Sequence, residues 1–188
     1  MQRAEALLVL VGLVLAIALG ALGALVFIGP GEKPCPACLN GRIETVFSPE
    51  AEDEIIGILQ GANKSLDVEM YLFNYRGLAD ELVKAKERGV SVRVILEPRL
   101  TGTENLEMMK YLRENGIDAR WASLDYKLTH AKAVIVDGKM VLVGSTNWSS
   151  SALKKNREYS VLIEDQDVAS EFLANFEKDW GMATSEAA

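Results

Sequence analysis

The sequence is poor in the residues that build disulfide scaffolds and metal sites. Its 188 residues include two cysteines, five prolines and a single histidine, His130. Two cysteines exclude a disulfide-built fold, and one histidine excludes any metal site that needs two histidines from one chain. Few prolines and 25% charged residues argue against wholesale disorder. The net charge of −7 argues against a generally basic coat for nucleic acid.

One long apolar run contributes much of the hydrophobic fraction of 49%. Ala6–Ile28 contains 23 residues without a charge or a hydrogen-bonding side chain. Because about 20 apolar residues span a bilayer as a helix, we predict a retained N-terminal membrane anchor in residues 1–28. A long signal peptide is the alternative. The flanking basic residues leave the orientation open, with a lean towards a catalytic domain outside the cytoplasm.

Residues 29–42 are predicted to form a linker, because glycine and proline interrupt any continuing helix. This segment holds both cysteines, Cys35 and Cys38. The pair is compatible with a local disulfide, a redox pair or half of a zinc site, and a four-thiolate site would need two chains. We favour a structural role, as a disulfide or a metal ligand pair.

Residues 43–182 alternate between strand and helix patterns and are predicted to form one α/β domain, with residues 183–188 as a tail. Ser48 and Pro49 are expected to start the first helix, with Ser48 as its N-cap. The expected strands are 43–47, 66–73, 90–96, 131–136, 140–143 and 159–163, and further helices are expected at 77–88, 103–115 and 167–180. Strand 66–73 should place Phe73 opposite Leu66, and Leu106 should belong to the apolar stripe of its helix.

Two groups with complementary chemistry lie two residues apart, at His130 and Lys132. On a strand they point to the same face, so a nucleophile or proton carrier stands beside a fixed positive charge. Ser145 and Asn147 can donate hydrogen bonds to an oxyanion, and Glu158 can orient the imidazole. These are the parts expected for attack on a phosphodiester. Each residue alone would be an ordinary turn or surface residue.

Charge is also concentrated around this group. Residues 120–157 hold seven basic and two acidic residues, a balance of +5, whereas residues 158–188 have a balance of −7. A basic segment in an acidic protein indicates an anionic ligand, although a solvated basic face is an equal alternative.

The pattern His130-x-Lys132-(x)4-Asp137, followed by Gly144-Ser145-x-Asn147 and Asn156-x-Glu158, resembles the HKD signature of the phospholipase D superfamily. The resemblance covers residues 44–180 and is strongest to small single-motif members, which are bacterial endonucleases and the membrane-anchored Zucchini type. It implies a mixed sheet flanked by helices on both faces. It also implies hydrolysis that requires no metal or other cofactor.

The resemblance assigns a role to each residue of the pattern. His130 would attack phosphorus and form a phosphohistidine, while Glu158 would hydrogen-bond the histidine. The residues expected to hold the phosphate oxygens are Lys132, Ser145, Asn147 and Asn156. Asp137 belongs to the catalytic signature, but its opposite strand parity and its Asp-Gly turn favour a structural role.

The mechanism needs two histidines, one to attack and one to protonate the leaving oxygen. Because each chain has one, the resemblance implies a homodimer with two motifs in one active site.

We predict cleavage of DNA or RNA. A phospholipid hydrolase is the alternative, and a non-catalytic nucleic-acid-binding protein is a third possibility. An apolar surface beside His130 would favour lipid, and a narrow basic groove would favour single-stranded nucleic acid. Arg99 is a further candidate for a phosphate contact, and Glu69 could approach the site.

Overall fold

The computed structural model describes residues 41–100, 102 and 104–186. In this part of the chain one seven-stranded sheet has the order β1-β7-β6-β5-β2-β3-β4. The strands are β1 (Arg42–Phe47), β2 (Ser65–Met70), β3 (Ser91–Leu96), β4 (Asp118–Trp121), β5 (Lys132–Val136), β6 (Met140–Gly144) and β7 (Tyr159–Glu164). Strands β2, β3 and β4 run parallel, and every other neighbouring pair is antiparallel. The sheet is therefore mixed, as the resemblance implied.

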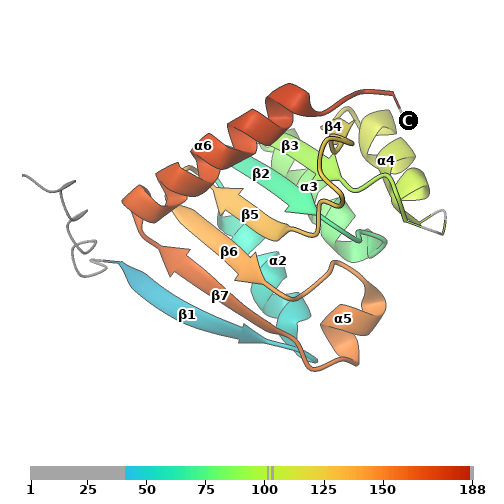
Figure 1. Ribbon diagram of the computed structural model, residues 1–188. Coiled ribbons are helices and arrows are strands. Elements are labelled where there is room, and N and C mark those ends of the chain that lie inside the picture. Colours follow the sequence, from blue (N-terminus) through green and yellow to red (C-terminus); the bar gives the residue numbers. More distant parts are fainter. Residues whose placement is uncertain (1–40, 101, 103, 187–188) are drawn as a thin grey trace, which may run out of the picture. The chain divides into compact units, whose positions relative to one another are not determined.

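Helices cover both faces of this sheet (Figure 1). They are α2 (Ala51–Gly61), α3 (Arg76–Glu87), α4 (Glu104–Glu114), α5 (Ser150–Lys154) and α6 (Gln166–Met182). Helix α6 lies across one face, and α2 and α3 lie on the other. Residues of β5 are buried throughout, with Val134 in the core on the α2 and α3 side and Ile135 in the core under α6. The prediction of an α/β domain with two covered faces is confirmed.

Three local expectations were wrong. The first helix begins at Ala51, and Ser48 does not cap it, because the Ser48 peptide continues the pairing of β1 with the start of β7. Its N–H donates to the Glu158 carbonyl at 3.2 Å, and its own carbonyl accepts from Arg157 at 2.9 Å. Strand β2 ends at Met70, so Phe73 is free of strand alternation and joins the same core as Leu66. In α4, Leu106 is 55% exposed because the buried stripe runs instead through Asn105, Met108, Met109 and Leu112.

The predicted anchor and the linker up to residue 40, with Cys35 and Cys38, lie outside the described residues. Among the residues that the structure does describe, no helix is long and apolar enough to cross a membrane.

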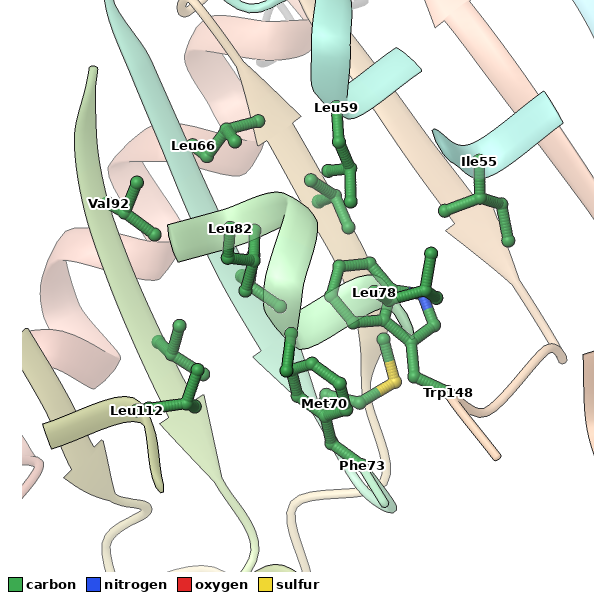
Figure 2. Close-up of a cluster of buried hydrophobic side chains, with 14 of the residues drawn as sticks. Ile55, Leu59, Leu66, Met70, Phe73, Leu78, Leu82, Val92, Leu112 and Trp148 are labelled. Atoms are coloured by element: carbon green, nitrogen blue, oxygen red, sulfur yellow. The ribbon is translucent and has the colours of Figure 1, made fainter. Parts of the chain in front are cut away.

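The larger core closes around Trp148 and Phe73 (Figure 2). Both side chains are almost fully buried, and their rings meet edge to face with centroids 4.7 Å apart. The backbone N–H of Trp148 also donates to the Leu72 carbonyl at 3.0 Å. The indole therefore joins the chain after β6 to the chain after β2.

Replacing Trp148 with alanine is expected to lower the free energy of unfolding by about 3–5 kcal/mol, because it leaves a large cavity in this core. Urea unfolding monitored by circular dichroism measures the loss. Leu106→Ala, at an exposed position of α4, is the control and should change the free energy by less than about 0.5 kcal/mol. Equal losses in the two variants would contradict the packing described here.

Candidate active site

His130 and Lys132 lie where β5 begins, beside the ends of β2 and β6. The ammonium nitrogen of Lys132 is 3.0 Å from Nδ1 of His130 and donates to the His130 carbonyl at 2.8 Å. The lysine is 8% exposed, and burial lowers its pKa from the ordinary value, whereas the charge of Glu158 opposes this shift. If the ammonium donates to Nδ1, a neutral imidazole carries its proton on Nε2.

A second cluster forms around the carboxylate of Glu158. Its Oε2 accepts from the Ser145 hydroxyl at 2.5 Å, and its Oε1 accepts from the Asn156 amide at 3.1 Å. The N–H of Tyr159 donates to the Ser145 hydroxyl at 3.1 Å. The hydrogen bonds found for Glu158 thus go to Ser145 and Asn156 and not to His130, which differs from the role that the resemblance implied. The two clusters are neighbours, because the pairing of Ala133 with Val143 places the start of β5 beside the end of β6.

The glycine and the asparagine of the pattern also have identifiable environments. A Cβ on Gly144 would clash with both the Ser160 hydroxyl and the Tyr159 carbonyl, so only glycine fits between β6 and β7. The side-chain oxygen of Asn147 is buried and has no hydrogen-bond partner among the residues that the structure describes. An unpaired buried acceptor costs about 1–3 kcal/mol, so Asn147 is a candidate for a bound donor.

Sequence reasoning did not assign a role to Tyr71, which lies next to His130 and Lys132. Its ring centroid is 4.4 Å from that of His130, and the Lys132 nitrogen is 4.9 Å from the tyrosine centroid. The Tyr71 N–H donates to the Ala131 carbonyl at 2.8 Å, which continues the β2–β5 pairing by one residue. The register of β2 and β5, which places Met70 opposite Lys132, brings Tyr71 next to His130. This register cannot be read from the sequence until the two strands are known to pair.

Asp137 is at the other end of β5, in the turn to β6, with a φ of 56°. Its carboxylate accepts from the N–H groups of Asn63, Lys64 and Ser65 at 2.7–3.1 Å. Five residues of strand separate this turn from His130, which corresponds to about 17 Å. The geometry corrects the grouping of Asp137 with the catalytic residues: it holds the loop between α2 and β2.

Asp137→Asn is expected to lower the free energy of unfolding by about 1–3 kcal/mol, because charge-assisted hydrogen bonds are lost. Burial tends to raise the pKa of Asp137, but the hydrogen bonds from Ser65, Lys64 and Asn63 outweigh it and keep the pKa below its usual value. The stabilisation is therefore present above about pH 4 and is lost as the pH falls through the folded-state pKa. Urea unfolding at neutral and acidic pH measures this difference. Exposed Glu171→Gln, on α6, is the control, and an unchanged Asp137→Asn midpoint at neutral pH would refute the prediction.

The two further candidates from the sequence, Arg99 and Glu69, do not join the group around His130. The guanidinium of Arg99 is bound to Glu97 and is therefore not available to bind a phosphate. Glu69 faces α6, where burial and the charge of Asp179 raise its pKa to about 7.

A family model described as "Cardiolipin synthase, PLD-like domain" matches residues 55–180. The chain belongs to the phospholipase D superfamily. A crystal structure of the phospholipase D family member Nuc from Salmonella typhimurium is similar, with a TM-score of 0.74 and 29% identity over 79% of this chain and 99% of Nuc.

Curated relatives of this phospholipase D-like domain include two kinds of named enzyme. It is 30% identical to "Mitochondrial cardiolipin hydrolase" of Canis lupus familiaris over 151 residues, which is 80% of this chain and 59% of that protein. It is 29% identical to "Phospholipase D" of Rickettsia conorii over 139 residues, 73% of this chain and 68% of that protein. The chain thus spans little more than half the length of the canine relative.

Proposed function

We propose that this protein is a metal-independent phosphodiesterase that cleaves nucleic acid through a phosphohistidine intermediate. The observation that carries the proposal is the 3.0 Å approach of Lys132 to His130 at the strand ends where Ser145, Asn156 and Glu158 also gather. A nucleophile, a cation and neutral donors at one place are what attack on a phosphodiester anion requires.

In the first step Nε2 of His130 forms a bond to phosphorus while the bond from phosphorus to the leaving oxygen breaks. A proton must reach that oxygen, and in the second step water must displace the histidine. Because Lys132 engages Nδ1 before substrate is present, a phosphate oxygen would draw the ammonium away from the ring. Once released, Nδ1 can take a proton from water while Nε2 gives its own proton to water, so the ring changes tautomer and the Nε2 lone pair becomes free to attack.

The proposed active site is built by two copies of the chain. His130 is the one histidine of the sequence, so a second imidazole, the proposed proton donor for the leaving oxygen, would be His130 of the second copy. The carboxylate of Glu158 binds Ser145 and Asn156 within its own chain. An acid that orients His130 would therefore also come from the second copy. A two-fold axis supplies both groups with one interface.

Nucleic acid is the proposed substrate because aromatic and basic side chains flank the cluster of Ser145, Asn156 and Glu158. Tyr159 directly follows Glu158, is 62% exposed and meets the exposed Phe47 edge to face with centroids 5.5 Å apart. Lys155 and Arg157 are exposed just before it. Single strands bind to such combinations, because bases stack on aromatic rings while cations hold the backbone.

Phospholipid hydrolysis is the second candidate, favoured by the segment that leads to His130. Leu124, Tyr126 and Leu128 are 52%, 46% and 41% exposed there. These exposed side chains precede His130 in the chain, and acyl chains could pack on them. The names of the relatives from Canis lupus familiaris and Rickettsia conorii agree with this candidate. The predicted anchor would bring either substrate site to a membrane.

The deciding experiment offers the full-length protein single- and double-stranded DNA, RNA and cardiolipin vesicles, each with EDTA. Cleavage of single strands is expected, with a loss of about tenfold in Tyr159→Ala from lost stacking. The small diester bis(p-nitrophenyl) phosphate should be hydrolysed equally by both proteins. Cleavage of cardiolipin alone would replace the nucleic-acid proposal by the second candidate, and complete inhibition by EDTA would refute metal independence.

A further inference from the structure

A buried carboxylate outside the recognised signature lies behind His130. Glu97, the first residue after β3, is 0% exposed. Its Oε1 accepts from the N–H and Nε of Arg99 at 2.9 and 2.6 Å. Its Oε2 accepts from Nη2 of Arg99 at 3.0 Å and from the N–H of Thr129 at 2.7 Å. The residue that immediately precedes the proposed nucleophile is therefore bonded to Glu97.

Arg99 extends this connection along the segment that leads to His130. Its Nη1 donates to the Tyr126 carbonyl, and its Nη2 also approaches the Ser123 carbonyl at 3.4 Å. The pair of Glu97 and Arg99 thus holds both the start of segment 123–129 and its last peptide. The segment has no regular secondary structure of its own between β4 and β5, so these bonds define its course.

Asn105 connects the same carboxylate residue to the other neighbour of the imidazole. Its side chain is 3% exposed and donates to the carbonyls of Glu97 at 2.9 Å and Tyr71 at 2.7 Å. Tyr71 in turn packs on the His130 ring. Asn105 therefore links the backbone of Tyr71 to the backbone of Glu97, whose carboxylate holds the Thr129 peptide before His130.

We propose that Glu97 is a positioning residue for His130, which it orients through the Thr129 peptide; this proposal rests on the proposed role of His130 as nucleophile. Four N–H donors converge on the two oxygens of Glu97, so the position requires a group that only accepts. Glutamine would direct its own N–H₂ at one of these donors. A shift of about 1 Å at a reacting atom can reduce a rate about 100-fold.

The carboxylate remains ionised at neutral pH. Burial alone would raise the pKa of Glu97, but the hydrogen bonds from Arg99 and Thr129 outweigh it and hold the pKa below its usual value. The acceptor is thus available over the pH range in which an imidazole acts.

The test compares Glu97→Gln with Asp67→Asn in the full-length protein. Asp67 is the matched control, because it is also buried, at 2% exposed, and bonded to an arginine, Arg93, at 2.7 Å, yet it lies within β2 opposite Ile135, near the end of β5 that is away from His130. In Glu97→Gln we expect kcat for bis(p-nitrophenyl) phosphate to fall about 10- to 100-fold with KM within about twofold. Asp67→Asn should keep kcat within about twofold, although its unfolding midpoint also falls.

A spectroscopic measurement separates positioning from loss of stability. Because His130 is the one histidine of the chain, labelling with [¹⁵N]histidine gives one pair of ring nitrogen signals. Glu97→Gln should shift this pair, because the ring changes its partners, and Asp67→Asn should leave it in place. Unchanged signals, or a kcat loss no greater than that of Asp67→Asn, would overturn the proposal.

Glu97→Asp covers the case in which Glu97→Gln does not fold. The shorter side chain keeps the charge beside Arg99 but withdraws from Thr129, so a smaller kcat loss in the same direction is expected. Full activity in this variant would also overturn the proposal. His130→Asn distinguishes failure of the proposed function from failure of the positioning proposal. An active His130→Asn refutes the proposed function and the positioning with it. An inactive His130→Asn beside an unaffected Glu97→Gln refutes positioning alone.

Discussion

His130→Asn is expected to reduce phosphodiester hydrolysis by about 10⁴-fold or more, because removing a covalent nucleophile removes the whole pathway. No other histidine exists in the sequence to replace it. Asparagine retains a polar side chain of similar reach, so the buried Lys132 keeps a hydrogen-bonding neighbour. Initial rates with bis(p-nitrophenyl) phosphate in EDTA measure the effect.

Two further observations make this expectation specific to the histidine. Acid-labile phosphate should be trapped on the wild-type protein when turnover is quenched with alkali, and it should be absent from His130→Asn. Leu106→Ala, at an exposed position of α4, should retain both the rate and the trapped phosphate. Activity above about 1% of wild type in His130→Asn would require a different nucleophile, since lost general-base assistance alone costs about 10²–10⁴-fold.

The sequence predicted well those features that depend on neighbours close along the chain. Strands β5 and β6 are near-continuous apolar runs joined by Asp137-Gly138-Lys139, and Asp137 and Gly138 both have positive φ, as an Asp-Gly turn between strands requires. The shared face of His130 and Lys132 follows from two-residue alternation, and the 3.0 Å contact agrees with it.

Features that depend on distant pairing were missed or misplaced. Strand β4 and helix α5 have only four and five residues, too few for a periodic pattern. Ser48 has the local form of a helix cap, but its peptide pairs with Glu158, which is 110 residues further along the chain. Glu97 looks like an ordinary charged residue after a strand, and only its bond to Thr129, 32 residues away, connects it to His130.

The signature residues divide in the same way. Ser145, Asn156 and Glu158 lie together, because β6 and β7 are antiparallel neighbours and bring the end of one to the start of the other. Asp137 belongs to the same sequence pattern but is carried to the far end of β5 by that strand. Linear spacing thus identifies the family, and strand direction decides which members of the pattern meet.

The second prediction with a large expected effect concerns the activity of dimers that combine a wild-type chain with a His130→Asn chain. If each active site contains His130 from two chains, a hybrid of wild type and His130→Asn has one histidine and should be inactive. When equal amounts are unfolded together and refolded, random pairing leaves about one quarter of the dimers with two histidines. Activity should therefore fall to about one quarter of an all-wild-type sample at the same total concentration, and it should follow the square of the wild-type fraction.

Independent sites would give a different curve, since half the protein would then supply half the activity. Different affinity tags on the two proteins allow the hybrid to be isolated, so that exchange of subunits is measured and not assumed. Refolding wild type with an equal amount of Leu106→Ala should keep full activity, because that residue lies exposed on α4 and contributes nothing to the site. A linear dependence with proven hybrids would refute the two-chain active site. A quadratic one would mean that this chain, with its single histidine, acquires its second catalytic imidazole by pairing with itself.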